Sequence, residues 1–248
     1  MKYIESKNND IFKNIKRLLL KPKNRKKSKK FVVEGLKEIM LCLESNYNLI
    51  ELFVCSEIHN KKHDDLYVKY KTTNLSKNLY KELSYKEKGD GFLAIFHSKE
   101  FNLNQLILTE NPFILVVESP EKPGNIGAIL RTADAAGIDA VIIANPKTEI
   151  YNPNIIRSSL GSIFSSQIGI GKTKEVIEFL KKNKIKIIST LIKNSVDYST
   201  VKFTGPCAII VGTESSTLSD DWINISDELI NIPMKGKMDS LNLSVTAA

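Results

Sequence analysis

The stretch IPMKGKMDSLNLSVTAA, from Ile232 to Ala248, decides the fold. It begins where an apolar run ends and continues through a loop that holds Gly236. The next residues place hydroxyl and amide side chains between aliphatic ones, which predicts a buried helix start from Leu241. Ser240 can cap that helix, because a serine oxygen accepts from a free amide of the first turn. Loop and helix start together predict a pocket of backbone donors and acceptors for a small polar ligand.

Two earlier segments complete a set with this one. The first is PGNIGAILRTA, residues 123–133, and the second is IIVGTE, residues 209–214. In this order and spacing, the three segments resemble the signature segments of the SpoU (TrmH-like) family, which are knotted RNA 2′-O-ribose methyltransferases. The resemblance is strong from Pro112 to the end of the chain and looser before it.

The C-terminal half alternates strand-like and helical runs, which predicts an α/β fold with a parallel sheet covered on both faces. The resemblance implies a deep trefoil knot, a known exception to unknotted chains, in which the C-terminal segment threads a loop. We expect a catalytic domain over residues 106–248 and a small α/β domain over residues 1–105. The expected strands are 113–118, 140–144, 185–190, 207–211 and 229–232, and the expected helices are 126–136, 174–183 and 241 onward.

The first hundred residues predict an α/β unit of their own. Apolar periodicity predicts a helix over 11–20, which is followed by a basic loop, a short strand at 31–33 and a helix over 34–43. Together with the motif FVVEG at 31–35, this order resembles the substrate-binding domain of many SpoU enzymes, whose fold is like that of ribosomal proteins that grip kinked RNA. Strands at 49–55 and 92–96, a helix at 75–83 and a polar linker over 97–111 complete the prediction.

The excess positive charge lies in this N-terminal part. The chain of 248 residues carries a net charge of +8; residues 1–100 hold 22 basic against 13 acidic residues, and the remainder holds 14 against 15. The run KPKNRKKSKK at 21–30 has seven basic residues and no acid. A basic cluster neutralises phosphates and releases counterions, so on charge alone nucleic acid is the predicted partner, with a merely solvated lysine-rich surface as an equal alternative. The resemblance to RNA methyltransferases favours RNA. The predicted RNA contacts here are Arg25, Lys26, Lys27, Lys29 and Lys30.

Composition argues against several other classes. No apolar run approaches the ~20 residues of a membrane helix, and the polar N-terminus is not a signal peptide. The three cysteines, Cys42, Cys55 and Cys207, are far apart and odd in number, which predicts reduced thiols in a cytoplasmic protein. His59 and His63 have helical spacing but no third ligand, so we predict no metal site.

The ligand-binding residues are predicted around one glycine. Gly212 ends the strand 207–211, at the edge where open α/β sheets bind ligands, and a glycine leaves room for a ligand against the backbone. A glycine that only turns the chain is the alternative. The resemblance implies that the ligand is S-adenosylmethionine and that Ile232 and Leu241 contact it largely through backbone groups. The implied cofactor-binding set is Gly212, Glu214, Ile232, Met234, Gly236 and Leu241.

Arg131 is the candidate for chemistry. Its spacing alone favours a surface or interdomain salt bridge, although a cation on this helix can hold an RNA phosphate. By resemblance, Arg131 is the catalytic residue, and Asn125, Ser240 and Asn242 complete the catalytic set. A guanidinium is ordinarily a poor proton acceptor. Arg131 would therefore act either as a base activated in the assembled site or as a cation that stabilises the ribose oxyanion and orients the phosphate.

The segment NPNIIRSSLG, residues 152–161, resembles the part of the family that lies beside the RNA site. Arg157 and Ser159 are predicted ribose or phosphate contacts. A surface charge and a helix cap are the alternatives for these two residues.

These patterns predict an RNA ribose 2′-O-methyltransferase of the two-domain ribosomal RNA type, with transfer RNA as a second substrate candidate. The resemblance implies a homodimer, and the protein would mainly position the reactants and assist the loss of one proton. The alternative is a non-catalytic RNA-binding or ribosome-assembly protein that retains the fold. It is favoured by Ser215–Thr217, where the family usually has a second glycine, and by the end at Ala248, beyond which the family's helix usually continues. We expect a complete knot to depend on those further residues.

Overall fold

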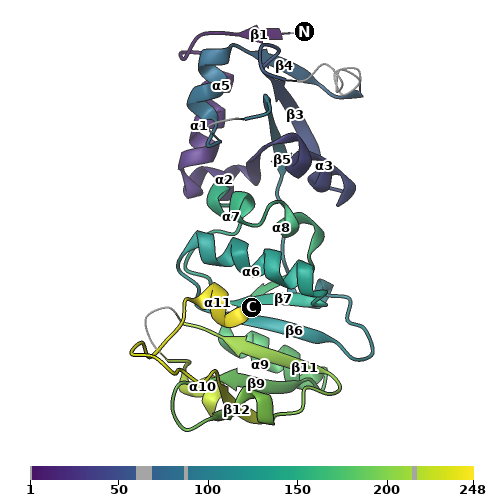
Figure 1. Ribbon diagram of the computed structural model, residues 1–248. Coiled ribbons are helices and arrows are strands. Elements are labelled where there is room, and N and C mark those ends of the chain that lie inside the picture. The colour runs from purple at the N-terminus through teal and green to yellow at the C-terminus, as the bar shows by residue number, and fades with distance from the viewer. Residues whose placement is uncertain (1, 60–68, 87–88, 214–216) are drawn as a thin grey trace. The chain divides into compact units, whose positions relative to one another are not determined.

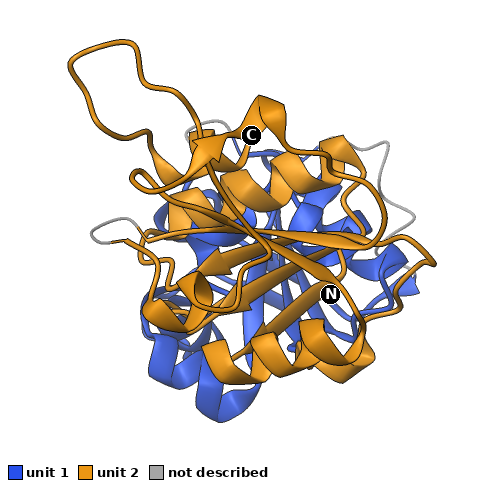
Figure 2. Ribbon diagram, turned by 90° about the horizontal axis from the view of Figure 1, so that it is seen from below, with its two compact units in different colours: residues 1–99, 151–165 blue, residues 100–150, 166–248 orange. Residues whose placement is uncertain are grey.

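The structure is a computed structural model that describes residues 2–59, 69–86, 89–213 and 217–248. The chain forms two compact units (Figures 1 and 2). Unit 1 comprises Met1–Lys99 and Tyr151–Ser165, and unit 2 comprises Glu100–Ile150 and Ser166–Ala248. The middle segment Tyr151–Ser165 is therefore part of the N-terminal unit, although the predicted boundary at residue 105 would place it in the catalytic domain.

Unit 1 is built on a five-stranded mixed sheet with the order β1-β4-β3-β5-β2. β1 and β3 both run parallel to β4, whereas β5 pairs antiparallel with β3 and β2. The predicted strands near 31, 49 and 92 are confirmed, and β1 and β4, which are short, had not been predicted. The strands are β1 (Lys2–Ile4), β2 (Lys30–Glu34), β3 (Leu49–Val54), β4 (Thr72–Leu75) and β5 (Phe92–His97).

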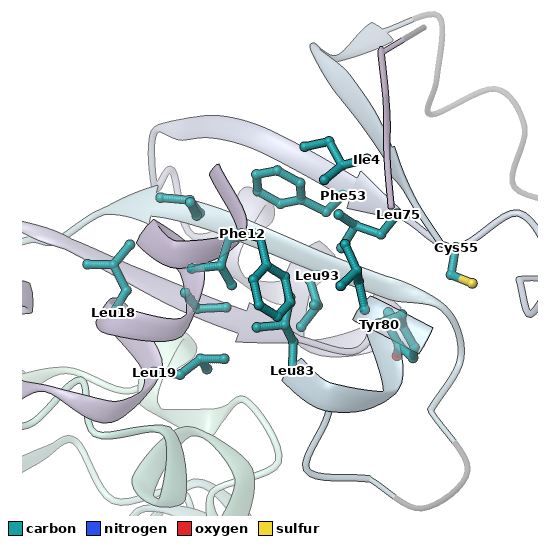
Figure 3. Close-up of a cluster of buried hydrophobic side chains, with 14 residues drawn as sticks. Ile4, Phe12, Leu18, Leu19, Phe53, Cys55, Leu75, Tyr80, Leu83 and Leu93 are labelled. Carbon is teal, nitrogen blue, oxygen red and sulfur yellow. The ribbon is translucent and has the colours of Figure 1, made fainter. Parts of the chain in front are cut away.

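One face of this sheet packs against α1 (Asp10–Leu20) and α5 (Lys77–Leu83), as Figure 3 shows. Asn9 begins α1 by accepting a hydrogen bond from the amide of Ile11 at 2.9 Å, which satisfies a free donor of the first turn. The buried members of α1 recur at helical spacing, as predicted. Burial of this apolar stripe is the main stabilising term for the helix. The buried α1 residues are Phe12, Ile15, Leu18 and Leu19.

The opposite side of β2 carries an aromatic cluster. Successive strand residues point to opposite faces, so Phe31 faces away from Val32, which belongs to the α1 side. Phe31 stacks on Tyr151, with ring centroids 4.3 Å apart, and on Phe164, at 5.9 Å. These contacts hold the segment Tyr151–Ser165 within unit 1. The helices packed here are α3 (Leu36–Glu44), α7 (Pro153–Ser158) and α8 (Ser162–Ser165).

The basic run was predicted as a loop, and that prediction is wrong. Residues Pro22–Ser28 form the helix α2. Pro22 stands at the first helical turn, where its fixed backbone angle and missing amide cost nothing. Lysine and arginine are good helix formers, and Lys29 ends the helix in the left-handed conformation.

Unit 2 holds a seven-stranded sheet with the order β10-β12-β9-β11-β6-β7-β8. Every pairing in it is parallel, as predicted. The five predicted strands are confirmed, and β8 and β10 are additions. The strands are β6 (Phe113–Glu118), β7 (Ala140–Ala144), β8 (Ile168–Gly171), β9 (Lys186–Thr190), β10 (Val196–Asp197), β11 (Cys207–Val211) and β12 (Glu228–Asn231).

The helices of unit 2 are α6 (Pro123–Ala136), α9 (Thr173–Lys182), α10 (Asp220–Ile223) and α11 (Leu243–Ala247). α11 packs against α6 and β11 (Figure 1). Because β9 lies between β12 and β11 in the sheet, the chain that leaves β12 passes β9 before it forms α11. Part of the predicted linker is also structured. Ile170 of β8 donates its amide to the carbonyl of Phe101 at 2.7 Å, and Leu103 and Leu106 pack against the core.

The three cysteines are free, as predicted, and they are buried. Burial raises the pKa of each thiol, so none is a ready nucleophile. Within the described residues, no helix has both the length and the apolar character needed to cross a membrane.

Candidate active site

A cavity of about 520 Å³ opens at the carboxyl ends of three neighbouring strands, β12, β9 and β11. This volume is typical of sites for small molecules, which run from about 300 to 1,000 Å³. The segment that leaves β12 and leads to α11 supplies another wall. The lining residues are Thr190, Leu191, Ile192, Gly212, Thr213, Thr217, Leu218, Asn231, Ile232, Met234, Gly236, Lys237, Met238, Asp239, Ser240, Leu241, Leu243 and Thr246.

The structure brings most of the predicted cofactor-binding residues together in this cavity. Glu214 lies outside the described residues. The hydroxyl-bearing Ser240, predicted as catalytic, lines the same space. Segments that are distant in sequence thus converge at the sheet edge where open α/β folds bind ligands. The converging predicted residues are Gly212, Ile232, Met234, Gly236 and Leu241.

We expected the missing side chain of Gly212 to leave room for a ligand, but in the structure it leaves room for Glu118. Gly212 has φ +144°, a conformation that other residues rarely adopt. A Cβ atom here would lie 2.5 Å from the carbonyl oxygen of Glu118 and 3.0 Å from its Cβ. The missing side chain therefore lets the end of β11 pack against β6. A larger residue would disturb the strand end before it filled the cavity.

The helix start after the cavity differs from the prediction. α11 begins at Leu243, and its N-cap is Asn242, whose Oδ1 accepts from the amide of Ser244 at 2.9 Å. Ser240 is therefore not the cap, because the helix begins two residues later than expected. Residues 232–242 are exposed in this chain, and Leu243 is the buried residue of α11. The predicted burial of the helix start is wrong for the residues before Leu243.

α6 carries the other two predicted catalytic residues on different faces. Asn125 is buried in the first turn, and Arg131 is exposed. Six residues at about 100° each turn the helix through about 240°, so their side chains diverge. Neither residue lines the cavity, and neither does Asn242. Among the predicted catalytic residues, the cavity of this chain contains Ser240 alone, within the part of the chain that the structure describes.

The basic helix α2 presents part of the predicted RNA surface. Lys26, Lys27 and Lys29 are exposed, and Lys30 is half-buried at the start of β2. Arg25 has another role. Its side chain is 3 % exposed, and Nη1 donates to the carbonyl oxygens of Leu18 at 2.6 Å and Leu19 at 3.1 Å. It closes the last turn of α1, whose carbonyls lack helical partners, so its predicted contact with RNA does not fit this burial.

The two predicted RNA contacts of the middle segment Tyr151–Ser165 differ in exposure. Ser159 is buried, and its Oγ donates to the carbonyl of Ile156 at 2.9 Å, which leaves it no access to a ribose or a phosphate. Arg157 is exposed. Its Nη2 donates to Asn154 Oδ1 at 3.1 Å, and its guanidinium carbon lies 5.7 Å from the ring centre of the exposed Tyr85. Arg157 therefore remains a candidate for RNA, and Tyr85 is a neighbour that the sequence analysis did not single out.

Sequence reasoning also missed a buried carboxylate beside the cavity. Glu118 ends β6 and is 4 % exposed. Its carboxylate accepts from Trp222 Nε1 at 3.0 Å, Thr173 Oγ1 at 3.0 Å and Asn145 Nδ2 at 3.2 Å. The signal was present, because a charged residue that ends an otherwise apolar buried strand needs partners. No group of three potential metal ligands occurs among the described residues.

Comparisons with known proteins give a family match for each half of the chain. Residues 112–248 match the SpoU rRNA Methylase family, and residues 8–94 match the MRM3-like substrate binding domain. The first match covers more than half of the chain.

Individual relatives extend over nearly the whole sequence. The 23S rRNA (guanosine(2553)-2′-O)-methyltransferase RlmP of Bacillus subtilis (strain 168) is 29% identical over 100% of this chain and 97% of its own. The 23S rRNA (uridine(2479)-2′-O)-methyltransferase of Streptomyces viridochromogenes is 27% identical over 96% of this chain and 87% of its own. Among solved structures, an AdoMet-bound rRNA methyltransferase from Sinorhizobium meliloti aligns with a TM-score of 0.91 and 25% identity, over 99% of this chain and 94% of that one.

Proposed function

This chain belongs to the SpoU rRNA methylase family, and from this premise we propose that it transfers a methyl group from S-adenosylmethionine to a ribose 2′-hydroxyl of ribosomal RNA. The observation that carries the proposal is the convergence of the predicted cofactor segments on one cavity. Gly212, Ile232 and Leu241 come from three places in the sequence and line the same space at the carboxyl edge of a parallel sheet.

The cavity suits this cofactor. Aliphatic side chains of Leu191, Ile192 and Leu241 offer apolar surface to an adenine ring, and the loop through Gly236 offers backbone amides and carbonyls. When bound, S-adenosylmethionine supplies a methyl group that its sulfonium already activates. The protein then has to hold the ribose hydroxyl in line with that group and help it lose one proton.

Arg131, Asn125, Ser240 and Asn242 are the residues to which we assign that work. Of these four residues only Ser240 lines the cavity within the described part of the chain, which supports assembly of the site in a homodimer. Apolar side chains in the cavity wall and next to it are exposed, and a second copy would cover them: in the wall Met238 is 71% exposed and Leu241 42%, and nearby on α11 Val245 is 54% exposed. Arg131 would serve as a base or as an orienting cation toward the ribose and its phosphate.

Unit 1 supplies the proposed grip on RNA. The exposed Lys26 and Lys27 on α2 and Lys29 just after it present positive charge, and Arg157 adds a planar cation beside Tyr85. The match of residues 8–94 to a substrate-binding domain supports this division of labour. We accordingly propose residues 1–105 as the RNA-binding domain and 106–248 as the catalytic domain, except that the segment Tyr151–Ser165, which carries Arg157, goes with the RNA-binding domain.

Two further features belong to the same proposal. We propose that the segment after β12 threads a loop of unit 2 as a trefoil knot; its return to α6 and β11 supports this path. Stretching a single chain from its two ends would test it, because a retained knot leaves the chain shorter than its contour length. We also propose a cytoplasmic location, which is compatible with three buried free thiols.

The decisive experiment incubates the protein with ribosomal RNA and methyl-labelled S-adenosylmethionine. Label in a ribose 2′-O-methyl nucleotide is the expected result, and cofactor binding without any RNA methylation would favour a non-catalytic RNA-binding protein. The two relatives are named for different nucleotides, guanosine 2553 and uridine 2479. Mapping the labelled position would therefore identify the target of this chain.

A further inference from the structure

We infer that Glu118 is a positioning residue for the cofactor-binding loop and that it acts through Trp222. The described residues of the loop between β11 and α10 that line the cavity are Gly212, Thr213, Thr217 and Leu218, and the inference concerns these residues. Glu118 does not line the cavity itself. The inference rests on the proposed function, because it assigns the loop to S-adenosylmethionine.

Both ends of this loop are set against the same residue. At its start, Gly212 packs so closely on the Glu118 backbone that no Cβ atom fits between them. Beyond its end, Trp222 of α10 donates its indole N–H to Glu118 Oε2 at 3.0 Å. The backbone of Glu118 therefore fixes where the loop begins, and its side chain fixes the helix to which the loop leads.

The carboxylate is held firmly enough to serve as a reference point. The Thr173 hydroxyl donates to it from the first residue of α9, and Asn145, just after β7, donates from a third element. Asn145 Nδ2 also donates to Thr173 Oγ1 at 2.5 Å, which ties the two donors to each other. A buried carboxylate with several donors has one favoured orientation, because any rotation would leave a buried polar group without its bond.

The indole connects this network to the cavity. Trp222 is fully buried, and Leu218, four residues earlier and just before α10, is 2 % exposed and belongs to the same core cluster. A shift of α10 would therefore move Leu218, and with it the neighbouring Thr217, at the cavity wall. These cavity-lining residues would then lose contacts with a bound ligand, whereas strands far from α10 would keep their positions.

The test compares two buried glutamates. Glu118→Gln keeps the size of the side chain but replaces one acceptor oxygen by an amide donor. The matched control is Glu51→Gln in unit 1, where a buried carboxylate also accepts from a threonine hydroxyl, Thr73 Oγ1 at 2.6 Å. Both variants replace a buried acceptor oxygen, but only the first adjoins the loop.

We expect Glu118→Gln to weaken calorimetric binding of S-adenosylmethionine by about tenfold or more and to raise its KM with a smaller change in kcat, as loss of ground-state binding contacts requires. Glu51→Gln should leave both constants unchanged. Trp222 is the single tryptophan of the chain and contacts Glu118, so its emission reports the surroundings of this contact. The cofactor-dependent change in emission should differ between Glu118→Gln and the wild type and be preserved in Glu51→Gln.

Trp222→Phe provides the second arm, and it decides the matter if Glu118→Gln does not fold. It removes the N–H and should weaken cofactor binding similarly, and the double variant should be less than additive because both changes break one connection. Unchanged cofactor affinity in folded Glu118→Gln or Trp222→Phe, or equal weakening in Glu51→Gln, would overturn the positioning role. Failure of the wild type to bind S-adenosylmethionine would instead overturn the proposed function.

Discussion

The ring of Tyr151 stacks on that of Phe31, with centroids 4.3 Å apart and ring planes 23° apart. The phenol oxygen of Tyr151 also accepts from the amide of Lys99 at 2.9 Å, and the Tyr151 hydroxyl donates to the carbonyl oxygen of Lys99 at 3.1 Å. One side chain thus joins three segments of unit 1 that are distant in sequence. This side chain is therefore one of the contacts that hold Tyr151–Ser165 in that unit.

Replacing this ring should destabilise unit 1. We expect Tyr151→Ala to lower the free energy of unfolding by about 3–5 kcal/mol, as for other large buried aromatics. Tyr151→Phe keeps the stack and should cost only about 1–2 kcal/mol for the lost hydrogen bonds. Urea unfolding measures both, and Tyr198→Ala, at an exposed tyrosine of unit 2, is the control. A loss in Tyr151→Ala no larger than in the control would show that the stack does not anchor the segment.

The same cluster predicts a dependence on alkaline pH. Burial raises the pKa of Tyr47 to about 12, and burial also raises that of Tyr151. Since the folded state binds these protons more tightly than the unfolded chain, the stabilisation is complete below the unfolded pKa of about 10 and is lost as pH rises toward 12. Stability from urea unfolding should therefore fall between pH 10 and 12. Tyr47→Phe should make that fall shallower, and an unchanged slope would contradict the assignment.

The basic helix should contribute affinity for RNA without contributing chemistry. Changing Lys26, Lys27 and Lys29 together to Gln should flatten the salt dependence of RNA binding by at most about one unit of slope for each lost phosphate contact. Affinity for S-adenosylmethionine should stay the same. Arg25→Gln is the informative contrast, because its buried guanidinium should affect stability more than the salt slope. If the triple variant keeps the wild-type slope, these lysines are only solvated surface.

Sequence patterns predicted the parallel sheet well, because strands buried on both faces are continuous apolar runs, such as residues 113–117 of β6. The patterns failed for short or ambiguous segments. β8 has only two isoleucines and two glycines, so it has no clear strand pattern. The lysine-rich sequence of α2 is typical of an exposed loop, although lysine also favours a helix. Asn242 and Ser240 are both good caps, so position alone could not choose between them.

The remaining wrong or missing predictions concern residues whose roles depend on contacts between segments that are distant in sequence. Arg25 resembles its basic neighbours until the carbonyls at the end of α1 are placed around it. The role of Tyr151 required knowing that Phe31 lies beneath it. The cavity residues, by contrast, were predictable because the carboxyl ends of parallel strands share one edge of the sheet.

Arg131 should matter to methyl transfer more than to folding or cofactor binding. It is exposed on α6, whereas the helix packs through Ile126, Ile129, Leu130 and other small or apolar residues. We expect Arg131→Ala to fold, to bind S-adenosylmethionine and to lose at least ~100-fold in turnover on RNA, the low end for a proton-transferring or charge-stabilising group. Arg131→Lys keeps the charge but loses the planar fork, so its activity separates charge from geometry.

The control for Arg131 is Lys181→Ala, which removes an exposed cation from the last turn of α9 in the same unit and should leave turnover unchanged. Circular dichroism and calorimetry with S-adenosylmethionine establish that each variant is folded and binds cofactor before its turnover is compared. If the site assembles in a homodimer, mixed dimers of wild-type and Arg131→Ala chains should keep part of the activity. Near-normal methylation by Arg131→Ala would remove this residue from the reaction and make Arg157, exposed beside Tyr85, the next cation to test.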